Sequence, residues 1–347
     1  MNASPRVSII IVTWNALPLL KKCLPSVVAT RYPDFEIILA DNASTDGSAE
    51  WVSATYPGIR IVRHPENWAF CKGNNEAVPH ATGTYILFLN NDVEVPPDWL
   101  RPLVDAMESD ASVAAVQPKL LQYDHRDRFE YAGASGGFLD ALGYPFMRGR
   151  IFSTMESDEG QYDDARDIFW ASGAAILLRR SALDEVGLFD ERFVMHMEEI
   201  DLCWRLQRHG YRIRVVPSSE VYHIGGASLP GHDPRKTYLN FRNNLLLLYK
   251  NLPPAHWPTT FRKRVAQDGL AIARAVLTGR PREAAAILRA YASAHKMSAL
   301  FDADRPTPSE RHVLPPYEGN IVIDYFVRGR HRFSDLPPEN FRLPPNP

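Results

Sequence analysis

The sequence predicts an α/β protein built on a mostly parallel sheet flanked by helices. Two observations carry this prediction. Short apolar, β-branched runs alternate with helical periodicity over residues 7–116, which requires right-handed crossovers between parallel strands. Polar residues also follow several of these runs directly. In such sheets ligands bind beyond the carboxyl ends of the strands, so the strand ends are where a site is expected.

The first half of the chain supplies most of this alternation. Residues 7–13 form a continuous apolar run, typical of a strand buried on both faces, and residues 17–29 carry apolar side chains at helical spacing. The same reasoning predicts strands at 35–40, 59–63, 85–89 and 113–116, with helices at 44–56, 68–80 and 97–108. Ser44 or Thr45 is expected to cap the helix at 44–56, which leaves Asp41 free to face a ligand.

The second half is less regular. Residues 120–169 are rich in Asp, Gly and Arg and are expected to be loops over the sheet. The elements predicted after them are a strand at 174–178, a Ser181-capped helix to Val186, a helix at 198–209 ended by Gly210, strands at 211–216 and 220–223, and a helix at 234–251. We expect one large domain over residues 1–250, divided at 117/118, and a helical extension at 251–347.

Composition excludes several classes of protein. The 347 residues include 39 Lys and Arg against 41 Asp and Glu, so the chain has no excess of positive charge for binding nucleic acid. Its apolar runs are far shorter than the roughly 20 residues that span a bilayer. Three scattered cysteines give neither a disulfide framework nor a zinc site. Without a signal-peptide pattern at residues 1–6, we expect a cytoplasmic protein.

Two strand ends carry residues suited to ligand chemistry. Asp41 opens the run Asp-Asn-Ala-Ser-Thr-Asp-Gly, and a carboxylate there can accept a hydrogen bond from a base imide or a ribose hydroxyl. Asn90, Asn91 and Asp92 follow the strand at 85–89. Oxygen ligands of this kind suit Mg²⁺ or Mn²⁺, although a turn rich in Asn and Asp explains the same residues about as well.

The motifs in their order resemble those of family 2 glycosyltransferases, which are inverting enzymes of the GT-A fold. The segments that carry the resemblance are residues 7–15 (VSIIIVTWN), 41–48 (DNASTDGS), 67–75 (NWAFCKGNN), 89–92 (LNND), 189–205 (FDERFVMHMEEIDLCWR) and 221–228 (VYHIGGAS). The match is closest to the rhamnosyltransferase-like branch that builds bacterial surface polysaccharides. It implies that residues 1–117 bind a nucleotide sugar and residues 118–250 bind the acceptor.

Carried over by position, the resemblance also implies residue roles. The donor-binding residues would be Thr13, Asn15, Asp41, Lys72, Asn90 and Asn91. Asp92 would bind Mg²⁺ or Mn²⁺ on the diphosphate, His223 would be a second metal or diphosphate contact, and Glu199 would be the general base. Two departures stand out: Asn90 replaces the first acid of the usual Asp-x-Asp motif, and Trp68-Ala69 replaces an expected glycine and phenylalanine.

Three acids lie within four residues at the predicted start of the helix at 198–209. Clustering of Glu198, Glu199 and Asp201 raises their pKa values towards neutrality, although acids in a first helical turn also simply complement the helix dipole. Glu198 and Asp201 share one face, and Asp201 is spaced to pair with Arg205. Glu199 points elsewhere, so it is the preferred base and Glu198 its main rival.

Acceptor binding is assigned to Trp170, Gly173 and Glu198, because small residues and an exposed aromatic ring suit a sugar. A plain strand entry explains Trp170 and Gly173 equally well. The leading hypothesis is metal-assisted transfer, with inversion, from dTDP-rhamnose or a UDP-sugar to a glycan or lipid-linked hydroxyl. The alternative is a non-catalytic nucleotide-sugar-binding subunit of a polysaccharide assembly complex. A dinucleotide oxidoreductase is disfavoured, because residues 13–16 contain no glycine-rich turn.

Residues 251–347 differ from the rest in charge, with 14 Lys and Arg against nine Asp and Glu. The predicted helix at 261–277 has an apolar face with basic residues opposite. It either packs on the main domain or contacts a membrane surface near a lipid-linked acceptor, at the inner face of the cell membrane. We expect the last 15 or so residues to be a loosely held tail. A homodimer is a further expectation.

Overall fold

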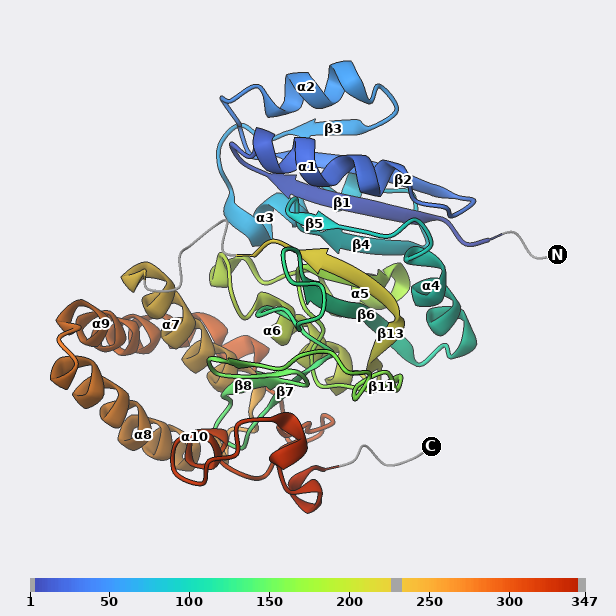
Figure 1. Ribbon diagram of the computed structural model, residues 1–347. Coiled ribbons are helices and arrows are strands. Elements are labelled where there is room, and N and C mark those ends of the chain that lie inside the picture. The colour runs from blue at the N-terminus through green and yellow to red at the C-terminus, as the bar shows by residue number, and fades with distance from the viewer. Residues whose placement is uncertain (1–3, 226–232, 343–347) are drawn as a thin grey trace.

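The centre of the molecule is one mixed sheet. The computed structural model describes residues 4–225 and 233–342. Across the sheet the strands run in the order β11 (Arg166–Asp167), β13 (Arg212–His223), β6 (Val113–Gln122), β12 (Ala175–Arg179), β4 (Tyr85–Leu89), β1 (Val7–Thr13), β2 (Phe35–Asp41) and β3 (Arg60–Arg63), and β5 (Val93–Glu94) pairs with β13 (Figure 1). Parallel pairing joins β4, β1, β2 and β3 to one another and β6 to β13. The strand β12 lies between β4 and β6 and runs antiparallel to both of them.

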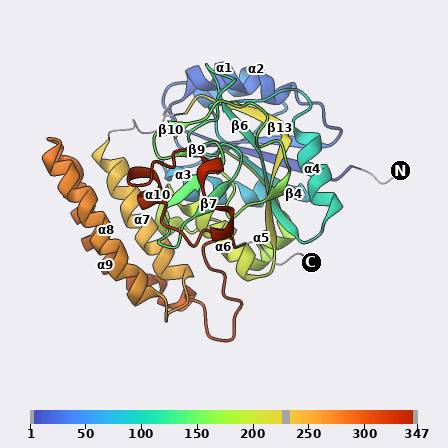
Figure 2. The same ribbon diagram turned by 60° about the horizontal axis from the view of Figure 1, so that its bottom comes forward.

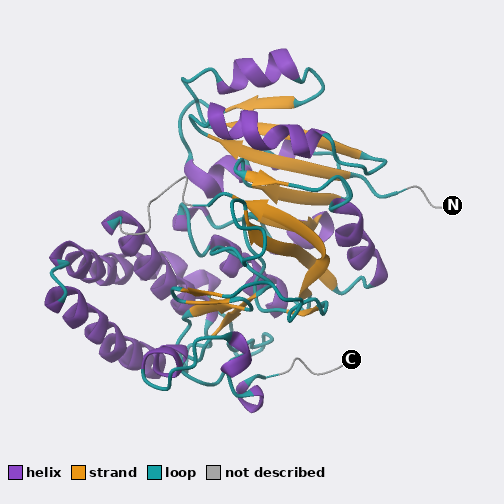
Figure 3. Ribbon diagram, viewed as in Figure 1, coloured by secondary structure: helices purple, strands orange, loops and turns teal. Residues whose placement is uncertain are grey.

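Helices cover both faces of this sheet, which explains the continuous apolar runs in its strands (Figure 3). Alternate residues of β1 enter different cores: Ile9 packs with residues of α1 (Leu17–Val28) and α4 (Leu100–Ser109), and Ile10 packs with residues of α3 (Ala69–Asn75), α5 (Arg180–Val186) and α6 (Glu198–Arg208). The strand therefore has no solvent-facing side and needs no polar alternation.

Two predicted helix caps are wrong. The helix α2 (Ser48–Thr55) begins four residues later than expected, after Gly47 in the left-handed conformation at φ +84°, so neither Ser44 nor Thr45 caps it. Both residues instead hold Asn15, as described below. The helix α5 follows Arg179 with no side-chain cap, so Ser181 does not cap it either. The two strands predicted at 211–223 form one strand, β13, with an irregularity between Val216 and Glu220.

A second, four-stranded antiparallel sheet lies where only loops were predicted. Its strands are β10 (Thr154–Met155), β9 (Arg150–Ile151), β8 (Pro145–Met147) and β7 (Gly137–Leu139), in that order. Strands of two or three residues leave no periodic pattern in a sequence, so this sheet could not be read from it. Gly137 lets Trp170 pack onto β7, since a Cβ there would lie 2.0 Å from the indole ring.

The C-terminal extension is helical, as predicted. The helices α7 (Pro234–Asn251), α8 (Trp257–Leu277) and α9 (Pro281–Ser298) lie together on one side of the molecule, with α10 (Ile321–Phe326) beyond them (Figures 1 and 2). The predicted apolar face of α8 packs on the main domain only in part: Phe261 joins the core, but the basic and apolar faces are not separated as expected. Arg264 is buried and donates to the Leu142 carbonyl and the Asn244 side chain, whereas Val276 and Leu277 are exposed.

The C-terminal segment is not a loose tail as far as residue 342. Phe333 and Phe341 pack with Phe138, and Tyr317 and Phe341 form an isolated β-bridge. Residues 343–347 lie outside the described part of the chain. No helix among the described residues is long and apolar enough to cross a membrane.

Candidate active site

The predicted donor residues meet at the carboxyl ends of three adjacent strands. In the parallel register of β1 and β2, Thr13 lies opposite Asp41, and both are 2% exposed. The strand β4 pairs with β1 on its other side, and Asn91, just beyond β4, donates from Nδ2 to Thr13 Oγ1 at 3.2 Å. Thr13, Asp41 and Asn91 therefore belong to one cluster.

Asn15 joins the ends of β1 and β2. Its backbone N donates to Ser44 Oγ at 2.9 Å, and its side-chain oxygen accepts from the Thr45 backbone N at 2.8 Å. Ser44 in turn donates from its backbone N to Asp41 Oδ1 at 3.2 Å. Asn15 has φ +47°, a conformation that asparagine tolerates better than most residues. Residues 41–48 thus form a loop that hydrogen bonds join to Asn15 at the ends of β1 and β2.

An aromatic–cationic stack lies beside this loop. The ammonium of Lys72 lies 4.1 Å from the centroid of the Trp68 ring, and the Trp68 ring packs at 4.7 Å from the His64 ring. The His64 backbone N donates to the Asp41 carbonyl at 2.8 Å. Trp68 stands where the resemblance leads one to expect a glycine. Its ring therefore lies beside the strand end that holds Asp41, with the Lys72 ammonium next to the ring.

The two predicted metal ligands are neighbours. Asp92 Oδ1 lies 3.0 Å from His223 Nε2, because β13 pairs with β5 immediately after Asp92. The Asn90 side-chain nitrogen lies 3.5 Å from the same His223 nitrogen. No group of three or more His, Cys, Asp and Glu within residues 4–225 and 233–342 is arranged to hold a metal. A carboxylate with an imidazole nevertheless fits Mg²⁺ or Mn²⁺, since such ions take much of their coordination from substrate phosphates and water.

Glu130 completes this group, and sequence reasoning missed it. Its Oε2 lies 3.3 Å from His223 Nδ1, within ion-pair range, although the direction does not make a hydrogen bond. Burial opposes a charged imidazole, yet Glu130 and Asp92 together raise the pKa of His223 to about 10. Glu130 lies in the irregular stretch and belongs to no motif. The Glu130 backbone N donates to the Leu120 carbonyl of β6, and β6 is paired with β13, the strand that ends at His223. This pairing brings the Glu130 side chain to His223.

Glu199 lies close to the strand-end cluster. A Cβ at Gly173 would be 3.7 Å from the Glu199 Cβ, and the carbonyl of the next residue, Ala174, accepts from the Asn90 backbone N at 2.9 Å. One Oε of Glu199 is buried without a hydrogen-bond partner, and burial raises the pKa of this carboxyl to about 7. A carboxyl of this kind can accept a proton near neutral pH.

Glu198 shares the environment of Glu199, since one of its Oε atoms is also buried without a hydrogen-bond partner, whereas Asp201 differs from both. Burial and the charge of Glu199 raise the pKa of Glu198 well above its ordinary value. The predicted pair between Asp201 and Arg205 is confirmed, with Nε and Oδ2 2.8 Å apart, and Lys250 binds the same carboxylate at 2.8 Å. Burial alone would raise the pKa of Asp201, but Lys250 and Arg205 hold it well below its usual range. Asp201 is therefore a structural anion.

The turn before Glu198 is strained, which sequence reasoning also missed. Val194, His196 and Met197 all have φ between +69° and +74°, which is unfavourable for residues with a Cβ and especially for a β-branched one. Asn243 of α7 holds the turn by donating from Nδ2 to the carbonyls of residues 193, 195 and 196 at 2.8–2.9 Å. Strain that a neighbouring element maintains is characteristic of functional sites.

The predicted acceptor residues differ in their positions. Gly173 lies next to Glu199 and to Phe70, 3.4 Å from the position of its missing Cβ. The expectation that Trp170 is exposed is wrong: it is 2% exposed and its indole N–H donates to the Phe138 carbonyl at 3.0 Å. Trp170 anchors β7 to the domain and offers no face to a sugar.

Comparison with known proteins is consistent with this geometry. The glycosyl transferase family 2 model matches residues 8–187. The chain is 32% identical over 234 residues to the O-antigen biosynthesis protein RfbC of Myxococcus xanthus, covering 66% of this chain but only 18% of RfbC. It is 30% identical over 241 residues to the N-acetylglucosaminyl-diphospho-decaprenol L-rhamnosyltransferase of Mycobacterium tuberculosis, covering 65% of this chain and 78% of that protein.

Two solved structures share the fold. The structure of GalNAc-T7 with UDP, GalNAc and Mn²⁺ aligns with a TM-score of 0.58 at 16% identity, over 72% of this chain and 48% of that one. The mannosyltransferase PcManGT from Pyrobaculum calidifontis, in complex with GDP-Man and Mn²⁺, aligns with a TM-score of 0.50 at 19% identity, over 87% and 81%. These likenesses confirm the predicted GT-A fold.

Proposed function

The chain belongs to glycosyl transferase family 2, and we propose that it is an inverting glycosyltransferase that moves a sugar from a nucleotide-diphosphate sugar to a hydroxyl of a glycan or lipid-linked acceptor. The observation that carries the proposal is the Glu199 carboxyl, which has one buried oxygen without a hydrogen-bond partner and a pKa raised to about 7, and which lies next to Gly173, the neighbour of the residue that bonds Asn90. Few structural carboxylates lie buried without a partner, because burial of an unpaired charge is costly.

In this proposal each strand end has one task. Thr13, Asn15 and Asp41 hold the nucleoside, and Lys72 with Asn91 lies on the donor side of the cleft. Asp92 and His223, with Asn90 beside them, hold Mg²⁺ or Mn²⁺. When bound, such an ion offsets the negative charge that develops on the leaving diphosphate. The Mn²⁺ complexes of the two solved structures support a divalent ion in this fold.

Glu199 accepts the proton of the acceptor hydroxyl as that oxygen attacks the anomeric carbon. One bond forms and the bond to the diphosphate breaks in a single displacement, which inverts the configuration. General-base catalysis of this kind contributes about 10²–10⁴-fold to a rate. Gly173, next to Glu199, leaves room for the acceptor. Glu198 remains a rival base and an acceptor contact.

Glu130 acts in this proposal as a positioning residue. A carboxylate beside the far nitrogen of a metal-binding histidine helps to orient the ring, so that Nε2 faces the ion. The 3.3 Å approach of Glu130 to Nδ1 and the 3.0 Å approach of Asp92 to Nε2 support this division of the two nitrogens.

The donor is proposed to be dTDP-rhamnose or a UDP-sugar, and the product a step in surface-polysaccharide synthesis, by similarity to the rhamnosyltransferase and RfbC. A panel of sugar nucleotides with Mn²⁺ tests this, because a ligand that binds the native state raises its melting temperature. We expect one donor to stabilise the protein and to be turned over. Stabilisation by a donor without any turnover, across a panel of acceptors, would favour the alternative of a non-catalytic binding subunit.

We also propose that the exposed apolar face of α8 contacts a membrane surface. Leu270 and Leu277 are 72% and 86% exposed, and Arg274 of the same helix lies 5.2 Å from the exposed Phe326 ring of α10. Apolar side chains interspersed with arginine suit the interface of an anionic membrane. In this proposal the protein acts at the inner face of the cell membrane, where a lipid-linked acceptor would be found.

A further inference from the structure

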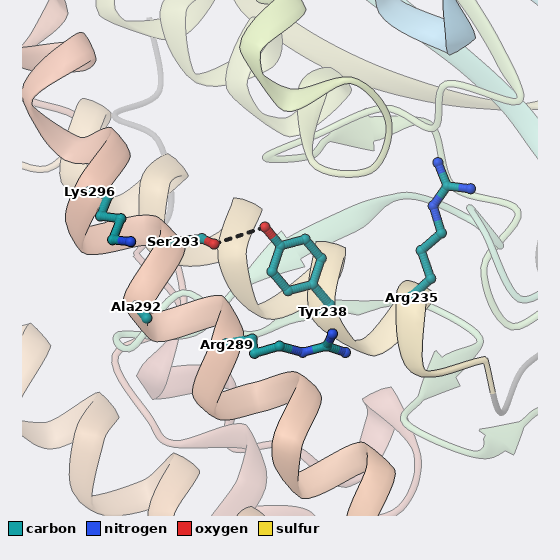
Figure 4. A pocket seen from close by; sticks show the side chains of 6 residues that line it. All are labelled: Arg235, Tyr238, Arg289, Ala292, Ser293 and Lys296. Carbon is teal, nitrogen blue, oxygen red and sulfur yellow. Dashed lines mark hydrogen bonds between the residues drawn. The ribbon is translucent and has the colours of Figure 1, made fainter.

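A cationic pocket lies between α7 and α9, outside the site described above. Its volume is about 430 Å³, within the range of about 300–1,000 Å³ that is usual for small-molecule sites. It is lined by Arg235 and Tyr238 of α7 and by Arg289, Ala292, Ser293 and Lys296 of α9 (Figure 4). On each helix the lining residues recur at three- or four-residue spacing, so one face of each helix forms the pocket.

The three cations of the pocket have no acidic partners. Within the described residues, no Asp or Glu carboxylate lies within 4.0 Å of the side-chain nitrogens of Arg235, Arg289 or Lys296. Asp233, the N-cap of α7, accepts from the backbone N of Arg235 at 2.7 Å. The helix α7 contains no Asp or Glu at all, and the one acid of α9, Glu283, pairs with Arg280. The residues outside the described ranges contain no Asp or Glu either. The three cations are exposed to solvent, so their positive charge is available to a ligand, and a surface with uncompensated positive charge attracts anions.

Hydroxyl groups line the space between these cations. Tyr238 Oη and Ser293 Oγ are 3.0 Å apart, and Figure 4 shows this hydrogen bond joining the two helices. Burial opposes ionisation of Tyr238, yet its hydrogen bond to Ser293 and the nearby Arg242 and Arg289 lower the pKa of this phenol below its ordinary value. The pocket thus has a positive potential and hydrogen-bond donors, which is the chemistry that binds phosphate oxygens.

The same helix connects the pocket to the proposed active site. Asn243 of α7 holds the turn before Glu198, and the charge of Lys236 helps burial to lower the pKa of His196 in that turn. The Lys236 ammonium lies 5.2 Å from the ring of Tyr131, the residue after Glu130. A ligand bound between α7 and α9 would therefore contact the same helix that holds the turn before Glu198.

We propose that this pocket binds the phosphate or diphosphate group that joins the acceptor saccharide to its lipid. The inference rests on the proposed glycosyl transfer and narrows its acceptor to a phosphate-linked saccharide. Arginine binds phosphate oxygens with a planar fork and lysine with a point charge, so Arg289 and Lys296 on one face of α9 can share the two phosphates of a diphosphate.

The test measures binding of geranyl diphosphate to the full chain by calorimetry in EDTA, so that no metal draws the probe to Asp92 and His223. The variant R289Q/K296Q removes two pocket charges. The matched control R262Q/R282Q removes two exposed arginines of α8 and α9 that line no pocket. We expect R289Q/K296Q to bind the probe at least tenfold more weakly than the wild type, R262Q/R282Q to bind within twofold of it, and Arg289→Lys to retain most of the affinity.

Equal affinity of R289Q/K296Q and the wild type, or equal losses in both double variants, would overturn the proposal. So would a result in which the pocket charges control binding to phosphatidylglycerol vesicles but not to geranyl diphosphate, since that would assign the pocket to a lipid headgroup. Binding of UDP and dTDP with Mn²⁺ is measured on the same variants and is expected to be unchanged. Failure of the wild type to bind any nucleotide would contradict the proposed function, whereas failure of the wild type to bind geranyl diphosphate while it still binds a nucleotide would contradict only this inference.

Discussion

At the scale of single residues, the environment of each acid decides what it can do. Asp201 and Glu199 are two positions apart in one helix, yet Asp201 is paired with Lys250 and Arg205 while one oxygen of Glu199 is buried with no partner. The sequence indicates the helix, the Asp201–Arg205 pair and the direction of Glu199. It cannot indicate Lys250, which lies 49 residues away along the chain, or the burial that sets the pKa of Glu199.

The first prediction concerns pH. Because burial raises the pKa of Glu199 to about 7, the base is protonated and inactive below that pH. We expect kcat/KM to rise about tenfold per pH unit up to about pH 7 and then to level off. A pH–rate profile at saturating Mn²⁺ measures this. A profile flat from pH 5 to 8 would contradict the assignment.

The second prediction concerns Glu130. Replacing it as Glu130→Gln removes the carboxylate that faces His223 Nδ1, and such losses typically weaken metal binding about 10–100-fold. Titration of Mn²⁺ by electron paramagnetic resonance measures this without any turnover. The matched control is Glu94→Gln, since Glu94 lies on the same edge of the sheet but pairs with Arg126. Unchanged Mn²⁺ affinity in Glu130→Gln would count against a positioning role.

At the scale of elements, the site is assembled by strand ends and one long helix. The sequence predicts β1, β4 and α7 with the bounds that the structure has, because long apolar runs and capped helices leave strong patterns. It misses the second sheet, whose strands are too short for any pattern, and it splits β13 at an irregularity. It also misses the role of α7 in holding the strained turn at 194–197, since a side chain that bonds three distant carbonyls has no local signal.

The third prediction tests that turn. In Asn243→Ala the carbonyls of Met195 and His196 lose the Asn243 donor, whereas that of Phe193 still accepts from Arg242, so we expect stability to fall by about 1–3 kcal/mol and kcat to fall more than donor affinity. Urea unfolding measures the first effect, and steady-state kinetics with direct nucleotide binding measure the second. Asn251→Ala is a comparison on the same helix, since its side chain bonds Asp201 and not the turn. Loss of donor affinity with kcat unchanged would contradict the role given to Asn243.

At the scale of the whole molecule, the C-terminal extension is part of the same packed body as the sheet. Phe301 and Ile321 belong to the core that contains Ile10 of β1, and Arg264 of α8 is buried against Leu142. Charge and periodicity predict a basic amphipathic helix here, but they do not indicate that Arg264 of the basic face is buried and pairs with Asp268, or that Val276 and Leu277 stay exposed. The division at residue 250 and the homodimer stay predictions.

The fourth prediction concerns this exposed face. The variant L270D/L277D adds two charges to the apolar face of α8, so we expect it to lose most sedimentation with phosphatidylglycerol vesicles while keeping nucleotide binding. Val327→Asp adds a charge at another exposed apolar residue and tests whether α10 shares the contact. If L270D/L277D instead turned a dimer into a monomer, with vesicle binding unchanged, the face would join two copies of the chain.

The central claim is that Glu199 is the base of a glycosyl transfer, and one comparison tests it most directly. Single-turnover transfer is measured at pH 8 with saturating donor and Mn²⁺ for the wild type, Glu199→Gln and Glu198→Gln. The account predicts that Glu199→Gln loses about 10²–10⁴-fold in rate while it binds the donor as tightly as the wild type, and that Glu198→Gln loses less. Transfer by Glu199→Gln within twofold of the wild-type rate would contradict the account.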